Sequence, residues 1–126
     1  MNVPDDRRYT DQHEWALDTG GVVRIGITDY AQDALGDVVF VEILVAPGDE
    51  VETGRIIAEV ESTKSVAEVY APIGGVVAEV NADLSGSPEI INGDPYGNGW
   101  FVGLRPGDAS ALGALLDAAA YAALIG

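Results

Sequence analysis

Short apolar runs separated by turn residues fill the chain between residues 22 and 104. The runs consist of β-branched and aliphatic residues, and glycine and proline interrupt them at intervals of roughly 8 to 12 residues, the spacing expected of β-sandwiches and small barrels. The pattern predicts strands over residues 22–26, 38–43, 50–62, 65–71, 74–80 and 100–104. We therefore expect an all-β core over about residues 22–104.

The segment TDYAQDALG, residues 28–36, predicts a short helix between two of these strands. Thr28 or Asp29 can serve as its N-cap, and Gln32 stands three residues after Asp29, the spacing of a capping box. Gly36 is a suitable C-terminal stop. We expect about two turns of helix here.

A second helix is predicted at the end of the chain, over about residues 108–125. Its expected apolar face contains Leu112, Leu115, Leu116, Ala119 and Ala123. This periodicity fits a helix that lies on a sheet. A membrane span is not expected, because about 20 strongly apolar residues would be needed and this tail is rich in alanine and contains aspartate.

Length and cysteine usage limit the architecture and the chemistry. A chain of 126 residues falls in the size range of one domain, so we expect a single domain over residues 1–126. The absence of cysteine excludes disulfides, thiolate metal sites and cysteine nucleophiles. Any redox chemistry must therefore come from an attached group.

The chain is strongly acidic, with 21 acidic against six basic residues and a formal charge of -15. Such a charge repels nucleic-acid phosphates and anionic membranes and favours partners with basic docking surfaces. The opening MNVPDDRRYTDQHEW has neither the apolar segment of a secretory signal nor the composition of a transit peptide. We expect a cytoplasmic, bacterial protein without nucleic-acid or membrane partners.

The stretch EVESTKSVAEVYA, residues 59–71, predicts a β-hairpin with Lys64 at its tip. If Thr63 and Lys64 form the loop, the cross-strand pairs are Ser62 with Ser65, Glu61 with Val66, Val60 with Ala67, and Glu59 with Glu68. Two-residue loops favour positive φ and Asn-Gly, which Thr-Lys suits badly. Like charges opposite one another are also unfavourable, by roughly 0.2 to 1 kcal/mol.

Local rules broken together tend to mark functional positions. Five of the six cations are arginine, and Lys64 is the only lysine. A compact amine can be acylated once it is deprotonated, which a guanidinium does not readily allow. Lys64 is therefore a candidate attachment point for a prosthetic group, and the alternative is an ordinary solvated turn residue.

Residues 60–77, VESTKSVAEVYAPIGGVV, resemble the lipoyl-lysine hairpin of the glycine cleavage system H-protein family. The resemblance covers about Tyr9 to Gly126. The segments YTDQHEW, GITDYAQDALGDVVFVE, APGDEVETG, INGDPYGNGW and LLDAAAYAALIG follow in the family's order and spacing. The block at residues 30–42 and the DPYGNGW turn distinguish H proteins from other lipoyl domains.

The resemblance implies a barrel-sandwich hybrid, lipoyl-domain-like and all-β with minor helices. It implies (R)-lipoate attached to Lys64 by a lipoate ligase or lipoyl transferase. A pyridoxal-phosphate glycine decarboxylase would load the arm with an aminomethyl group, a tetrahydrofolate-dependent aminomethyltransferase would unload it, and a dihydrolipoyl dehydrogenase would reoxidise it. The protein itself would be a monomeric, non-catalytic carrier in glycine catabolism, with no catalytic residues and no metal ligands of its own.

The expected cofactor site is the hairpin around Lys64, with Glu61, Ser62, Thr63 and Ser65 as its neighbours. Acylation removes the lysine charge, whereas the loaded arm would end in a protonated amine. We therefore hypothesise that Glu68, together with Glu14 from the opening strand, holds the loaded arm against the body of the protein. The alternative is that both are solvated strand residues.

Other chemistries have little support in the sequence. His13 is the only histidine, so a structural or surface role is expected. No G-x-S-x-G elbow, dinucleotide fingerprint or EF-hand loop is present. The alternatives to a glycine-cleavage carrier are an H-like lipoyl donor in lipoate metabolism, a biotin carrier domain and an unmodified acidic interaction module. Biotin carriers usually have methionine beside the lysine, where this chain has Thr63 and Ser65.

Overall fold

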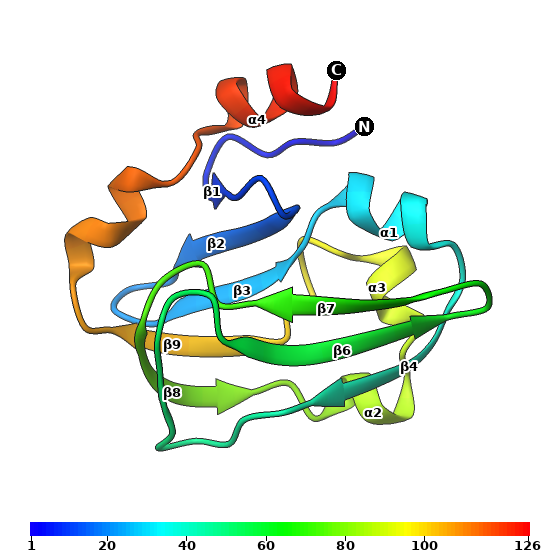
Figure 1. The fold of residues 1–126 in the computed structure, drawn as a ribbon, viewed down its shortest axis with the longest axis horizontal. Coiled ribbons are helices and arrows are strands. Elements are labelled where there is room, and N and C mark those ends of the chain that lie inside the picture. Colours follow the sequence, from blue (N-terminus) through cyan, green and yellow to red (C-terminus); the bar gives the residue numbers. More distant parts are fainter.

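Two antiparallel sheets form the framework of the computed structural model, which describes residues 1–126 (Figure 1). One sheet has six strands in the order β1-β2-β3-β9-β8-β5, and the other has three in the order β4-β6-β7. In chain order the strands are β1 (Arg8–Tyr9), β2 (Glu14–Asp18), β3 (Val23–Ile27), β4 (Val38–Ile43), β5 (Glu50–Val51), β6 (Ile56–Ser62), β7 (Val66–Tyr70), β8 (Gly75–Val80) and β9 (Val102–Pro106). The expected all-β fold with minor helices is confirmed, and no closed barrel forms.

The apolar core lies between the two sheets. Ile25 and Leu104 of the six-stranded sheet and Val60 and Val69 of the three-stranded sheet are buried in one cluster. The base of the β6–β7 hairpin is therefore fixed by the core, while its tip extends beyond it. Burial does not alternate strictly, since consecutive residues are buried in several strands, such as Glu14 to Ala16 in β2 and Ile25 to Ile27 in β3.

Two of the predicted strand boundaries are wrong. The strand expected over residues 50–62 is divided into β5 and β6, which lie in different sheets because a turn at Gly54, with φ 90°, separates them. The β core also begins before residue 22, since β1 and β2 belong to the six-stranded sheet. The four-residue helices α2 (Asp83–Gly86) and α3 (Ile90–Gly93) lie between β8 and β9, in a segment for which the sequence predicts neither a strand nor a helix.

Helix α1 (Asp29–Leu35) begins and ends at the predicted residues. The Thr28 hydroxyl accepts a hydrogen bond from the nitrogen of Ala31, and the nitrogen of Gly36 donates to the Gln32 carbonyl at 3.0 Å. The predicted capping box is wrong. Because Thr28 is the cap, Gln32 instead donates to the side chain of Asp29, with 2.8 Å between the two atoms.

The single helix predicted over residues 108–125 is also wrong. A 3-10 helix (Ala109–Ala114) is followed by an extended segment and then by α4 (Ala118–Ile125). Leu116 exchanges two backbone hydrogen bonds with Tyr9, at 2.8 and 2.9 Å. Asp117 then caps α4 by accepting from the nitrogen of Ala120 at 2.8 Å, and aspartate is more favourable at an N-cap than inside a helix.

The expected apolar face of the tail forms only in part. Leu112 and Leu115 pack against the main core, and Leu116 packs against a second cluster formed by Tyr9, Trp15 and Tyr121. Ala119 and Ala123 are exposed, and Tyr121 is the only buried residue of α4. No helix of the structure combines the length and the apolar character that crossing a membrane requires.

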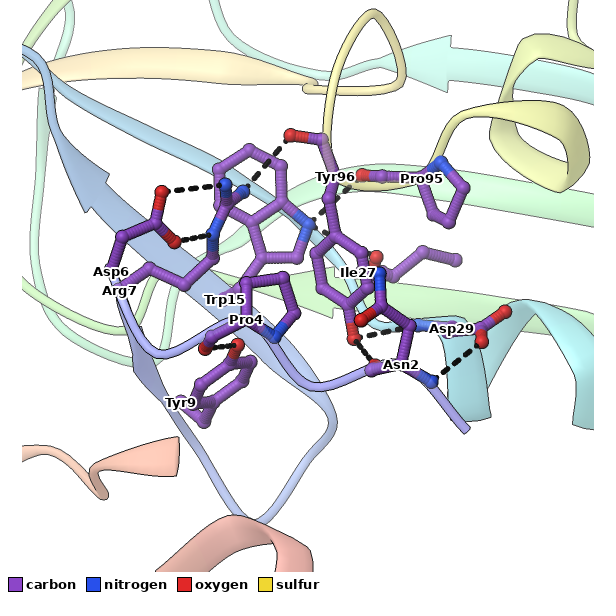
Figure 2. Close-up of polar contacts among 10 residues, drawn as sticks. All are labelled: Asn2, Pro4, Asp6, Arg7, Tyr9, Trp15, Ile27, Asp29, Pro95 and Tyr96. Carbon is purple, nitrogen blue, oxygen red and sulfur yellow. Dashed lines mark hydrogen bonds and ion pairs between the residues drawn. The ribbon is translucent and has the colours of Figure 1, made fainter. Parts of the chain in front are cut away.

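The first residues of the chain run along β2 and reach α1 (Figure 2). The backbone nitrogen of Asn2 donates to the Asp29 carboxylate at 3.0 Å, and the Tyr96 hydroxyl donates to the Asn2 carbonyl at 2.6 Å. Arg7 donates to the Tyr96 carbonyl at 2.9 Å, and the indole nitrogen of Trp15 donates to the Pro95 carbonyl at 3.0 Å. The DPYGNGW turn thus fastens the N-terminal segment to the sheet.

Candidate functional site

The hairpin that carries Lys64 has the predicted register. Glu59 pairs with Glu68, Val60 with Ala67 and Glu61 with Val66, and the nitrogen of Ser62 donates to the Ser65 carbonyl at 2.8 Å. In Figure 1 the β6–β7 hairpin reaches beyond the neighbouring elements, away from both chain termini. The fold therefore presents Lys64 at a protruding tip.

The turn at the tip differs from the strained loop that was expected. His13 is the only non-glycine residue with positive φ, so neither Thr63 nor Lys64 adopts the left-handed conformation. The Ser62 hydroxyl oxygen accepts hydrogen bonds from the nitrogens of Lys64, at 3.3 Å, and Ser65, at 3.1 Å. A serine side chain that bonds nearby backbone groups stabilises a turn without glycine, so Thr-Lys is tolerated here.

Lys64 is exposed and makes no ion pair. Its stem passes close to the end of α1, since a Cβ atom built on Gly36 would lie 3.4 Å from the Cε of Lys64. The nitrogen of Thr63 donates to the Asp37 carbonyl at 3.1 Å, which joins the turn to the start of β4. The hairpin tip is thus held by backbone contacts, and its amine is accessible.

Glutamates cross the outer face of the three-stranded sheet in one row. Glu59 lies opposite Glu68 on one side, as predicted, and opposite Glu42 on the other. The next row towards the tip contains Phe40 of β4, Glu61 of β6 and Val66 of β7. Sequence reasoning missed Glu42 and Phe40, because the pairing of β4 with β6 joins segments that are distant along the chain.

A cavity of about 310 Å³ opens beside the hairpin and lies between β7, α1 and residues 12–14. Its lining includes Glu14, Glu68, His13, Tyr30, Leu35 and Ser65. The structure therefore brings the two predicted acids, Glu14 and Glu68, to one cleft that begins next to Lys64. We refer to this cavity as the arm cleft.

The two acids occupy different environments in the arm cleft. Glu14 is 2% exposed, and its carboxylate accepts hydrogen bonds from the Thr10 hydroxyl at 2.7 Å and the Tyr70 nitrogen at 3.0 Å. Burial raises the pKa of Glu14, although these two hydrogen bonds oppose the shift. Glu68 is exposed at the rim of the cleft. The alternative of a solvated strand residue is therefore wrong for Glu14.

His13 and Tyr30 are cleft residues that sequence reasoning did not assign to the site. Their rings lie 4.7 Å apart, centroid to centroid, and both line the arm cleft. Burial lowers the pKa of His13, against an opposing effect of Asp11. No periodicity or motif singles out either residue, because the cleft forms only when residues 12–14 meet α1 and β7.

A two-sheet antiparallel fold with an exposed lysine at the tip of a protruding hairpin defines a carrier domain of the lipoyl-attachment class. The family model described as "Glycine cleavage H-protein" matches residues 7–126. The chain therefore belongs to the glycine cleavage H-protein family. Membership supports a lipoyl-carrier role in glycine cleavage and makes the protein a carrier component of that system.

Individual relatives agree with this assignment. The glycine cleavage system H protein of Thermus thermophilus is 54% identical over 121 residues, which cover 96% of this chain and 94% of the relative. That of Mycolicibacterium smegmatis is 55% identical over 127 residues, covering 98% and 96%. The crystal structure of a glycine cleavage system H protein from Mycobacterium marinum is 42% identical, with a TM-score of 0.88 and coverage of 98% of this chain and 99% of that one.

Proposed function

We propose that Lys64 carries (R)-lipoate as an amide, attached by a lipoate ligase or a lipoyl transferase. The observation that carries the proposal is the position of the only lysine, exposed and without an ion pair at the tip of the hairpin. Amide formation joins the lysine Nζ to the carboxyl carbon of a lipoyl group that the ligase has activated with ATP as the adenylate; the bond between that carbon and the adenylate oxygen breaks, and AMP leaves together with the protons that the amine loses. The side chain thereby loses its charge.

The carrier would accept an aminomethyl group from glycine decarboxylase and deliver it to a tetrahydrofolate-dependent aminomethyltransferase. Dihydrolipoyl dehydrogenase would then restore its oxidised form. Lipoate supplies the disulfide that takes up the aminomethyl group and electrons, and the protein supplies position, with no catalytic residue of its own. A charge of -15 favours partners with basic docking surfaces and keeps the carrier monomeric between encounters with them. These encounters would take place in the bacterial cytoplasm.

The residues of the arm cleft fit a lipoyl arm. Leu35, Ala67 and Val69 give the cleft apolar walls, which suit an aliphatic chain and a ring of carbon and sulfur. Glu14 and Glu68 add two carboxylates to this lining. A loaded arm ends in a primary amine that is protonated at neutral pH, so the same cleft offers apolar contact to the stem and negative charge to the end.

The buried carboxylate of Glu14 can take part in this contact without losing its present partners. A carboxylate offers about four lone-pair sites, and the bonds from Thr10 and Tyr70 use two of them. We propose that Glu14 and Glu68 together hold the loaded arm and shelter it from hydrolysis. Glu14 contributes a carboxylate that two hydrogen bonds hold in place, and Glu68 contributes an exposed carboxylate at the rim of the cleft.

Attachment is tested by intact-mass spectrometry after incubation with a lipoate ligase, lipoate and ATP. The wild type should gain one lipoyl group and the Lys64→Arg variant none, because arginine keeps the charge but cannot form the amide. In a reconstituted glycine cleavage system, the same variant should support no glycine breakdown. Persistent turnover by Lys64→Arg, or a biotinyl or unmodified mass for protein from the native host, would contradict the proposal.

Sheltering of the arm is tested separately with the Glu14→Gln/Glu68→Gln double variant. It should fold, accept lipoate and lose its aminomethyl group to water faster than the wild type. The matched control is Glu42→Gln/Glu59→Gln, which removes two charges from the outer face of the three-stranded sheet and none from the arm cleft. Equal lifetimes for the two double variants would argue against the assigned role.

A further inference from the structure

One wall of the arm cleft is formed by three consecutive residues, Gln12, His13 and Glu14. Gln12 and His13 lie in the turn that connects β1 to β2, and Glu14 is the first residue of β2. Within this turn His13 has a φ of 67°, which places it in the left-handed region. Residues other than glycine rarely hold this conformation unless the surrounding structure fixes them there.

The backbone of His13 is fixed on both sides. Its nitrogen donates to the Thr10 carbonyl at 3.2 Å, and its carbonyl accepts from the Thr28 nitrogen at 3.0 Å. These bonds connect residue 13 to the end of β1, which Thr10 follows, and to the cap of α1. They hold the main chain but leave the imidazole free to turn.

The imidazole is held by Tyr121, which comes from the other end of the chain. The Tyr121 hydroxyl lies 2.8 Å from the Nδ1 of His13 and 2.7 Å from the hydroxyl oxygen of Thr28. If Thr28 donates to Tyr121 and Tyr121 donates to Nδ1, each hydroxyl hydrogen has an acceptor. Neutral His13 then carries its hydrogen on Nε2.

Tyr121 is the point at which α4 is anchored. It is the only buried residue of that helix, and its ring stacks on Tyr9 with 4.7 Å between centroids and 10° between planes. Figure 1 shows α4 next to β1, so the helix lies outside the sheet that supports the cleft wall. A phenylalanine could provide the same stacking, whereas the two hydrogen bonds require the hydroxyl group.

We propose that Tyr121 is a positioning residue for the arm cleft and that it acts through His13. The C-terminal helix α4, which carries Tyr121, would then stabilise the cleft wall from the side that faces away from the cavity. The inference rests on the proposed function, in which the loaded arm lies in this cleft. The hydroxyl of Tyr121 keeps the imidazole in place beside Tyr30, and the left-handed backbone of the turn brings Gln12 and Glu14 to one wall of the cleft. The contacts of the His13 imidazole with Tyr121 and with Tyr30 do not involve the hairpin or Lys64.

The first test uses the unmodified protein and follows the single imidazole by NMR during a pH titration. The variant Tyr121→Phe removes the hydroxyl that we assign as the donor to Nδ1. A donor at Nδ1 favours the neutral imidazole, so in this variant the pKa of His13 should rise and the Nε2-H tautomer should lose its dominance. Tyr9→Phe is the matched control, because it also deletes a buried tyrosine hydroxyl, one that donates to the Pro4 carbonyl. The neighbouring groups Asp11, Glu14 and Tyr30 are unchanged in both variants.

The second test measures how long the lipoylated, aminomethyl-loaded protein survives in water. Tyr121→Phe should shorten this lifetime by roughly three- to tenfold, the range that corresponds to one lost hydrogen bond, and Tyr9→Phe should not. His13→Gly accommodates the positive φ without strain but lacks the imidazole. In that background, Tyr121→Phe should cause no further shortening.

The outcomes separate this inference from the proposed function. Equal shortening by Tyr121→Phe and Tyr9→Phe would overturn the inference, since general destabilisation would then explain both. Unchanged lifetime in Tyr121→Phe, with a shortened lifetime in Glu14→Gln/Glu68→Gln, would overturn it while the proposed function stands. If neither variant changes the lifetime, the arm does not lie in this cleft and both proposals fail.

Discussion

The carboxylate of Glu14 accepts a hydrogen bond from the backbone nitrogen of Tyr70, with 3.0 Å between the two atoms. Glu14 belongs to β2 in the six-stranded sheet, and Tyr70 ends β7, an edge strand of the three-stranded sheet. A buried backbone N–H group requires a partner, and here a side chain from the other sheet provides it. The same carboxylate therefore joins the two sheets and lines the arm cleft.

The first prediction concerns the pH dependence of stability at Glu14. Burial raises the pKa of this carboxyl group in the folded state above its ordinary value of 4.5. The folded state then binds the proton more readily than the unfolded state, so the contribution of Glu14 to stability falls as pH rises through this window. As pH falls from about 7.5 to 4, the free energy of unfolding of the wild type should increase relative to that of Glu14→Gln.

Urea unfolding of both proteins across this pH range measures the effect. Glutamine has one acceptor oxygen where Glu14 has two, so Glu14→Gln loses the hydrogen bond from either Thr10 or Tyr70. That loss shifts the difference by an amount that does not depend on pH, so only the slope tests the prediction. A difference that stays constant between the two ends of the range would show that Glu14 titrates alike in the folded and unfolded states.

The second prediction concerns the turn that presents Lys64. Ser62→Ala removes the oxygen that accepts from the nitrogens of Lys64 and Ser65, so these two amides should exchange hydrogen with solvent faster. The free energy of unfolding should fall by about 1 kcal/mol. Ser65→Ala is the control, since its exposed hydroxyl only approaches that of Ser62 at 3.4 Å. Similar exchange rates in the two variants would mean that the Ser62 hydroxyl does not hold the turn.

The features that could be predicted from the sequence are those that neighbouring residues determine. The register of Glu59 with Glu68 follows from the period-two pattern on both sides of one short loop, and the structure has it. The ends of α1 follow from Thr28 and Gly36, whose capping chemistry is local. The family resemblance was likewise carried by continuous segments.

The features that were missed depend on contacts between distant segments. In the tail, helical periodicity continues through Leu116, but its bridge to Tyr9 replaces helical hydrogen bonds there. Histidine adopts a positive φ more often than most residues, but the sequence does not show that residue 13 does so, because its hydrogen bonds with Thr10 and Thr28 fix this conformation. The arm cleft could not be predicted as a cavity for the same reason, and the role assigned to Glu14 and Glu68, which both line it, stays a prediction.

The third prediction concerns Arg7 in the N-terminal segment. Its guanidinium carbon lies 4.7 Å from the ring centroid of Trp15 and 5.3 Å from that of Tyr96, and one nitrogen donates to the Tyr96 carbonyl. Lysine keeps the charge but lacks the planar group that stacks and donates in several directions. Arg7→Lys should therefore lower the free energy of unfolding by about 1 to 2 kcal/mol.

The control for Arg7→Lys is Arg105→Lys, at an exposed position near the end of β9. Surface exchanges of this kind usually change the free energy of unfolding by less than about 0.5 kcal/mol. Urea unfolding followed by tryptophan fluorescence measures both variants. If the two exchanges have equal effects, the stacking of Arg7 seen in Figure 2 does not stabilise the N-terminal segment.

The last prediction concerns Gly26, which faces Trp15 across β2 and β3. A Cβ atom at Gly26 would lie 2.5 Å from two carbons of the indole, so one of the two residues would have to move. Trp15 cannot move freely, because its indole nitrogen donates to the carbonyls of Ile27, at 3.1 Å, and Pro95, at 3.0 Å. Gly26→Ala should therefore cost about 2 to 4 kcal/mol, from overpacking together with weakened hydrogen bonds.

Gly86→Ala provides the matched comparison, because no atom lies within 4 Å of a Cβ at that position and its φ is not positive. That exchange should be neutral or stabilising, by up to about 1 kcal/mol, since alanine restricts the unfolded chain. If Gly26→Ala unfolds at the same urea concentration as Gly86→Ala, the indole must be able to shift. Pro95 would then hold the DPYGNGW turn against β2 less firmly than these distances imply.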